Sequence, residues 1–140
     1  VFEDSVQPLL DAGIVDLVEP GHRVSESVTL QLGAGHTPGH LVMDVRSRDE
    51  SALFVADVLH HPVQLYCPDW NSPYCEDQEQ ARRTRWRVLA MAAEREEVLL
   101  SAHWGGAHCC RVRRAGAAFE PVFDVRAAID QPAAPPSPGG

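Results

Sequence analysis

The chain has 140 residues, of which 44% are hydrophobic, and its formal net charge is −8. This length and apolar content are sufficient for one domain with a core. The acidic balance argues against a nucleic acid or an anionic membrane as a partner. No apolar run approaches the ~20 residues of a membrane-spanning helix. No signal peptide is visible, and the expected location is cytoplasmic.

The N-terminal part of the chain predicts one helix and three strands. Apolar residues recur at a helical spacing over 2–12, and Gly13 is placed to end that helix. A short strand is expected at 14–18. Apolar and polar residues alternate over 28–32, the pattern of a half-buried strand, and 41–46 predicts its neighbour.

The C-terminal part predicts a buried strand, a long loop, a helix and further strands. Residues 52–56 are wholly apolar, as in an interior strand. The segment 58–75 contains three prolines and several large rings, so we expect it to wrap the mouth of a site. A helix is expected from Asp77 to about Arg95, where Asp77 and Gln80 resemble a capping box. The remaining predicted strands are 98–102, 110–114 and 118–123.

Histidine and aspartate side chains stand where predicted strands end, which indicates a metal site. His36 lies in a Gly- and Pro-rich turn between two strands, Asp57 follows an apolar strand, and His103 follows the strand after the helix. Two imidazoles and a carboxylate are a ligand set that suits zinc. We expect their ligand atoms to lie within roughly 3 to 6 Å of a common point at one edge of the sheet.

The other histidines have different expected roles. His40 is expected to orient the turn or a ligand rather than bind a metal, because it follows His36 too closely after Pro-Gly. His60 either lines the pocket or is simply exposed. His108 competes with His103 for the ligand position but is expected at the surface or on the substrate side. His22 is expected at the surface.

The cysteines and an Arg-rich segment suggest two further sites that their context disfavours. Cys67 and Cys75 are eight positions apart, and Cys109 and Cys110 are adjacent, so neither pair has the spacing of a zinc site. Cys67 and Cys75 could form a disulfide in an oxidising compartment and are free thiols in the cytosol. The arginines of 82–87 are flanked by acidic residues, which predicts a salt-bridged, solvated helix face rather than a phosphate site.

Three ordered motifs resemble the metallo-β-lactamase superfamily: Gly-His-Thr-Pro-Gly-His at 35–40, a strand ending at Asp57, and a strand ending at His103. The run His60–Leu65 is similar to the branch that contains lactonases and organophosphate hydrolases. The resemblance implies an α/β fold, the metallo-β-lactamase-type αββα sandwich. Of that fold this chain would supply the C-terminal half, a mixed sheet with flanking helices. We expect residues 1–129 to form this part and 130–140 to be a disordered Pro/Gly-rich tail.

The resemblance also implies a site with two zinc ions. Asp57 would bridge both ions and act in catalysis, His36 would complete the first ion, and His103 the second. His40 and His60 would lie behind the ligands or in the substrate pocket. The implied reaction is hydrolysis of a small-molecule ester, lactone or phosphoester by a metal-bridging hydroxide. Iron or manganese is the alternative metal, and the alternative functions are an iron-dependent redox enzyme or an inactive metal-binding fragment.

One motif of the family is absent. The HxHxDH motif that begins its metal site does not occur, and the chain begins at Val1. We therefore expect a truncated piece of a longer protein, inactive on its own. A half-sandwich leaves the inner face of its sheet uncovered, which predicts an exposed apolar patch. Its residues would come from those that line or flank that face: Val28, Leu30, Leu32, Val42, Val45, Phe54, Val55, Val98 and Leu100.

Overall fold

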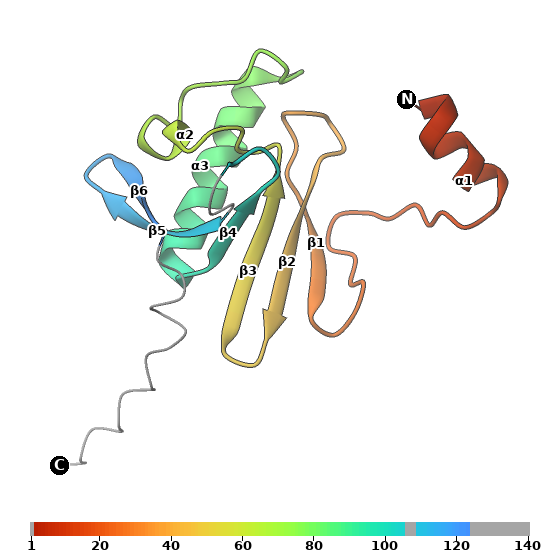
Figure 1. The fold of residues 1–140 in the computed structure, drawn as a ribbon, viewed down its shortest axis with the longest axis horizontal. Coiled ribbons are helices and arrows are strands. Elements are labelled where there is room, and N and C mark those ends of the chain that lie inside the picture. Colours follow the sequence, from red (N-terminus) through yellow and green to blue (C-terminus); the bar gives the residue numbers. More distant parts are fainter. Residues whose placement is uncertain (1, 106–108, 124–140) are drawn as a thin grey trace.

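The computed structural model describes residues 2–105 and 109–123. Its helical elements are η1 (Phe2–Val6), α1 (Gln7–Asp11), α2 (Val63–Tyr66) and α3 (Gln78–Arg95). Its strands are β1 (Val28–Leu32), β2 (Leu41–Ser47), β3 (Glu50–Ala56), β4 (Val98–Ser101), β5 (Cys109–Ala115) and β6 (Ala118–Val122). The described residues thus form a mixed sheet with flanking helices, as expected (Figure 1).

The strands lie side by side in chain order, from β1 to β6. Every neighbouring pair is antiparallel except β3 and β4, which run parallel. A parallel pair requires a long crossover, and α3 supplies it. The C-terminal ends of β3 and β4 therefore lie next to each other, beside the turn that joins β1 to β2.

One face of the sheet packs against α3. Along β2 and β3, Val42, Leu53 and Val55 point to this side and are fully buried or nearly so, because successive strand residues alternate between faces. They meet Val88 and Leu89 of α3. The rest of this core cluster consists of Val58, Leu59, Leu65, Ala92, Leu99, Trp104, Cys110, Val112 and Phe119.

The opposite face of the sheet carries apolar residues that the described elements leave uncovered. None of them is buried, and Phe54 and Leu32 are 39% and 46% exposed. We call this set the open face: Val28, Leu30, Leu32, Leu41, Met43, Val45, Ala52, Phe54, Ala56, Val98, Leu100 and Cys109. The expected apolar patch is present, but Val42 and Val55 do not belong to it, because the alternation turns both toward α3.

Helix α3 begins and ends where its flanking residues predict. The Asp77 side chain accepts a hydrogen bond from the Gln80 backbone N–H at 2.8 Å. The Gln80 side chain turns forward to Thr84, so only one half of a capping box forms. At the other end Glu96 adopts a left-handed conformation with φ 55°.

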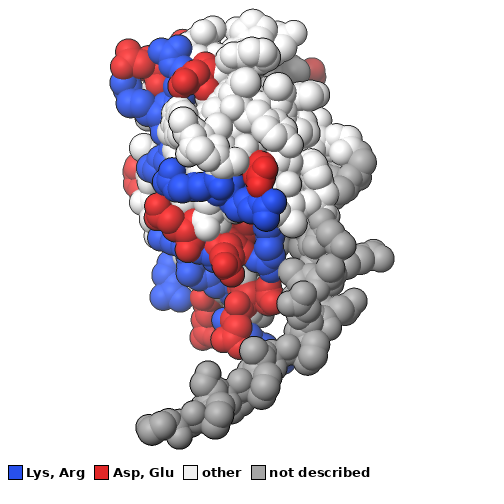
Figure 2. Space-filling model, turned by 90° about the vertical axis from the view of Figure 1, so that its left-hand side faces the viewer, with Lys and Arg blue, Asp and Glu red and all other residues white. Residues whose placement is uncertain are grey.

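Some of the exposed arginines pair with nearby carboxylates, whereas Arg87 donates to the backbone carbonyl of Leu32. Arg83 pairs with Glu79 one turn away on α3, and Arg114 lies 3.5 Å from Glu94. Figure 2 shows basic and acidic side chains intermixed on the surface seen from the β6 side. Arg85, which belongs to the Arg-rich segment 82–87, is instead fully buried. The prediction of a solvated face is therefore wrong at that residue.

The N-terminal segment forms a helix that stands apart from the sheet (Figure 1). It is divided into η1 and α1, with Pro8 in the first turn of α1, and Gly13 follows with a φ of +66°. The strand expected at 14–18 is wrong: these residues form no regular element, and Leu17 is 92% exposed. Among the described residues, no neighbouring strand pairs with this segment.

The remaining described features are the long loop, the cysteines and the apolarity of the helices. The 58–75 loop contains the short helix α2, which the sequence did not predict. Among the described residues, all four cysteines are free. No helix in the described ranges is long and apolar enough to cross a membrane. His108 and the predicted tail at 130–140 lie outside the described residues.

Candidate functional site

The turn between β1 and β2 carries His36 and His40 and is fastened to the start of α3. The backbone N–H groups of Asp77 and Glu76 donate to the carbonyls of Gly35 and His36 at 3.0 and 3.1 Å. Gly35 has a φ of +134°, and a Cβ there would lie 2.3 Å from the backbone nitrogen of Ala81. Only glycine allows so close an approach, so this glycine fixes the turn against the helix.

Asp57 is placed by a bulge at the end of β3. The pairing of β3 with β4 shifts between Phe54 and Ala56, and Ala56 has a φ of +42°. A left-handed conformation costs a non-glycine residue roughly 1–2 kcal/mol. Such bulges re-aim the side chains that follow them. Here the bulge precedes Asp57, whose backbone N–H donates to His40 Nε2 at 3.2 Å.

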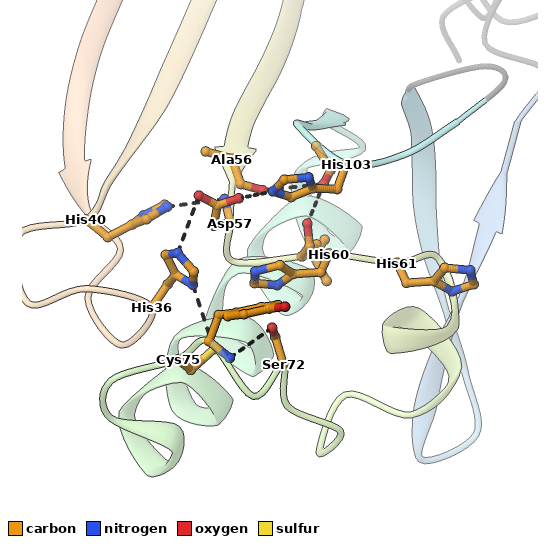
Figure 3. A network of polar contacts seen from close by, with 12 residues as sticks. His36, His40, Ala56, Asp57, His60, His61, Ser72, Cys75 and His103 are labelled. Atoms are coloured by element: carbon orange, nitrogen blue, oxygen red, sulfur yellow. Dashed lines mark hydrogen bonds and ion pairs between the residues drawn. The ribbon is translucent and has the colours of Figure 1, made fainter. Parts of the chain in front are cut away.

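The Asp57 carboxylate faces a different histidine with each oxygen. Its Oδ1 lies 2.5 Å from His103 Nε2, and its Oδ2 lies 3.6 Å from His36 Nε2. The His103 side chain is 54% exposed, whereas that of His36 is 19% exposed. Figure 3 shows the three side chains converging from separate elements.

His60 is the fourth side chain of this group and lies against two of its histidines. The centroid of its ring lies 5.0 Å from that of His36. The ring stacks on His103 with a centroid distance of 5.3 Å and an interplanar angle of 3°. Both of its ring nitrogens are buried and lack a hydrogen-bond partner among the described residues. His36, Asp57 and His60 each offer one ligand atom within 4.8 Å of the others. The sequence left the role of His60 open, and the structure places it inside the site.

Burial keeps two of these imidazoles neutral. Burial lowers the pKa of His60, and it also lowers the pKa of His40, although Asp57 opposes both shifts. Neutral imidazole is the form that binds a metal ion. Burial also raises the pKa of Cys75, whose Sγ lies 4.0 Å from His36 Nδ1, so this neighbour is a thiol at neutral pH.

An open cavity of about 590 Å³ lies over these groups. It is lined by His36, Asp57, His60, His103, Ser72 and Tyr74. Ser72 and Tyr74 belong to the loop that was expected to wrap the mouth of the site. The large rings of this loop, Tyr74 among them, are the basis of that expectation. No sequence signal singles out Ser72, because its place depends on how the loop folds back. His22 is exposed in a turn beside β1, and His61 is exposed and directed away from the site (Figure 3).

The donor set fits the metal that the sequence suggests. A carboxylate with one oxygen opposite each of two imidazole Nε2 atoms can serve two ions, one per oxygen. The unpartnered nitrogens of His60 add a further donor. Imidazole and carboxylate together are common ligands of zinc and are also compatible with iron or manganese.

Comparisons with known proteins bear on the fold. No protein-family model matches the sequence, and no curated protein matches it. Solved structures do match. AidC, a dizinc quorum-quenching lactonase in complex with a product, matches with a TM-score of 0.73 and 19% identity, over 86% of this chain and 46% of its own. The hydrolase AbOPH of the beta lactamase superfamily matches with a TM-score of 0.79 and 21% identity, over 86% of this chain and 42% of its own.

A third structure supports the same fold. A probable metal-dependent hydrolase from Staphylococcus aureus matches with a TM-score of 0.69 and 17% identity, over 79% of this chain and 40% of its own. The chain therefore spans less than half the length of each of these three structures. Over the part that they share, the chain has the metallo-β-lactamase fold.

Proposed function

We propose that the chain contributes part of the active site of a metal-dependent hydrolase that acts on a small-molecule ester, lactone or phosphoester. The observation that carries the proposal is the Asp57 carboxylate, whose two oxygens face the Nε2 atoms of two separate histidines. The fold shared with a dizinc lactonase and other hydrolases supports it.

The roles of the side chains follow from their positions. His36 and His103 would each hold one ion, and Asp57 would contact both. His40 receives the backbone N–H of Asp57 and so fixes the carboxylate from behind. His60 faces the cavity with unpartnered nitrogens, so it would contact an ion or the substrate. When bound, two zinc ions would lower the pKa of a water molecule and polarise the substrate's carbonyl or phosphoryl oxygen.

The residues of this chain leave the coordination of two ions incomplete. Structural and catalytic zinc sites take three or four protein ligands per ion. Asp57, His36, His103 and His60 are four donors, fewer than two such ions require. We therefore propose that further donors come from outside the described residues. The hydrolytic assay should use the longest polypeptide that contains this chain.

The test combines metal analysis with turnover. The polypeptide is purified without added metal, and its zinc, iron and manganese contents are measured. A lactone, an aryl ester and a phosphotriester are then assayed with wild type, Asp57→Asn and His61→Ala. His61 is the matched control, since it is exposed and points away. The proposal predicts zinc and turnover that both depend on Asp57 and not on His61. Iron at about one per chain with oxygen consumption would favour the redox alternative.

A further inference from the structure

Arg85 is a fully buried cation on α3, close beneath the site. Its Nε donates to the Val58 carbonyl at 3.0 Å, and its Nη1 donates to the Pro68 carbonyl at 2.7 Å and to Asn71 Oδ1 at 3.2 Å. Its side chain has no exposed surface. Among the residues that the structure describes, no carboxylate lies within ion-pair distance of it, although the nearby Asp69 favours its charge, and Nη2 has no hydrogen-bond partner. Burying a cation on neutral acceptors is costly, so this position calls for a reason.

The acceptors of Arg85 lie at the two ends of one loop, residues 58–71, which we call the clamped loop. Val58 directly follows Asp57, whereas Pro68 and Asn71 are near the far end. A second contact closes the loop from inside: the Gln64 side chain accepts the His60 backbone N–H at 2.6 Å and donates to the Trp70 carbonyl at 2.8 Å. The loop backbone is thus fixed on both sides of His60.

The guanidinium group suits this task better than other side chains. It offers five N–H donors in a rigid planar fork, so it can reach carbonyls from separate parts of a loop at once. A lysine offers a single charged nitrogen, and an apolar side chain of similar length offers no donor. The nitrogens of the His60 ring make no hydrogen bond within the described chain, so ring contacts and the loop backbone are left to orient it.

We propose that Arg85 is a positioning residue: by tying the two ends of the clamped loop, it holds the His60 ring stacked beside His103 on the wall of the cavity. The loop and ring geometry do not require a bound metal. Only the consequence for turnover rests on the proposed hydrolase function.

The test uses the longest polypeptide that contains this chain, prepared without metal, and compares Arg85→Met, Arg85→Lys and the control Arg83→Met. Arg83 lies on the same helix but is exposed and pairs with Glu79. The first readout is amide hydrogen exchange in the clamped loop relative to β2 and β3. The second is the set of ring-proton chemical shifts of His60 and His103, which report the stacked geometry directly.

Arg85→Met is expected to accelerate exchange in the clamped loop by about tenfold or more, since three hydrogen bonds are lost, while the sheet amides change little. The ring shifts of His60 and His103 should move together, with Arg85→Lys in between and Arg83→Met like wild type. Unchanged ring shifts in Arg85→Met would overturn the proposal, as would equal loss of protection in loop and sheet. If Arg85→Met does not fold, Arg85→Lys decides by the same two readouts.

The outcome is separable from that of the proposed function. Zinc binding that does not depend on Asp57 would contradict the metal site and leave the role of Arg85 intact. Conversely, Asp57-dependent zinc binding with wild-type ring shifts in Arg85→Met would contradict only the positioning role.

Discussion

At the scale of single residues, Asp57 is constrained at three atoms by three histidines. Its two carboxylate oxygens face His103 and His36, and its backbone N–H is bound by His40. These contacts divide the histidines into two kinds. His36 and His103 point at the charge and can share an ion with it, whereas His40 contacts the backbone and controls where the charge lies.

Asp57→Asn should therefore weaken zinc binding far more than His40→Ala. The asparagine keeps the shape but removes the negative charge that both neighbouring histidines face. Loss of a supporting residue such as His40 typically lowers metal affinity about 10–100-fold. A competition titration with a chromophoric chelator measures both. Equal losses in the two variants would show that the roles of His40 and the ligands were assigned wrongly, and His61→Ala gives the baseline.

Gly35→Ala should destabilise the fold strongly, whereas Gly39→Ala should be nearly neutral. A Cβ at Gly35 would meet the backbone of Ala81 at 2.3 Å, at a φ of +134°. A Cβ at Gly39 would meet nothing within 4 Å. Strain of this kind costs about 1–3 kcal/mol before the clash is counted. Urea unfolding of both variants measures the free energy of unfolding. A loss below about 0.5 kcal/mol for Gly35→Ala would contradict the tight contact between turn and helix.

At the scale of elements, local pattern predicted the strands that pair within the sheet. Alternation located β1 with its observed bounds, and the apolar run 52–56 located most of β3. The strand predicted from the mostly apolar residues 14–18 did not form, because a strand requires a partner that the local sequence does not reveal. Helix α2 was missed, since four residues between prolines carry no period.

In the candidate site too, the sequence predicted some residues and missed others. His36, Asp57 and His103 could be singled out because each stands beside a strand end, and parallel β3 and β4 bring two of those ends together. The stacking of His60 on His103 and the burial of Arg85 depend on how a long loop folds across α3. No local period or motif encodes that path.

A charge cluster of two buried carboxylates and two half-exposed arginines joins the C-terminal end of α3 to β2. Glu97 is fully buried, with its Oε1 3.0 Å from Arg46 and 3.7 Å from Arg95. Asp44 is buried beside it and also contacts both arginines. Burial, reinforced by Asp44, raises the pKa of Glu97 even though the arginines oppose the shift.

The raised pKa of Glu97 predicts a pH-dependent contribution to stability. In the folded chain the carboxyl group holds its proton to a higher pH than its ordinary 4.5. Its contribution is therefore complete below pH 4.5 and is lost as pH rises through the folded value. Relative to wild type, Glu97→Gln should become progressively more stable over that window. The unfolding free energy of Glu97→Gln minus that of wild type, measured at each pH from 4 to 8, should rise with pH. A flat or falling difference would contradict the raised pKa.

At the scale of the whole molecule, the two faces of the sheet differ in what covers them. The α3 face contains residues such as Leu53 and Leu99 that have no exposed surface. The open face presents a continuous set of apolar side chains from β1 to β5, and none is buried. Monomeric soluble proteins rarely expose contiguous apolar patches larger than a few hundred Å². A sheet with one apolar face uncovered ordinarily packs that face against a second layer.

The isolated 140-residue chain should therefore bind an apolar dye and self-associate through the open face. Phe54→Lys places a charge at the centre of that face, opposite Met43 of β2, and should lower both dye binding and association. Gln78→Lys adds the same charge on the exposed start of α3 and serves as the control, expected to behave like wild type. Sedimentation velocity over a range of concentrations and dye fluorescence measure the two effects. A wild-type chain that stays monomeric, binds no dye and melts cooperatively would mean that the open face is stable in water, against the cost that its exposed Phe54 and Leu32 imply.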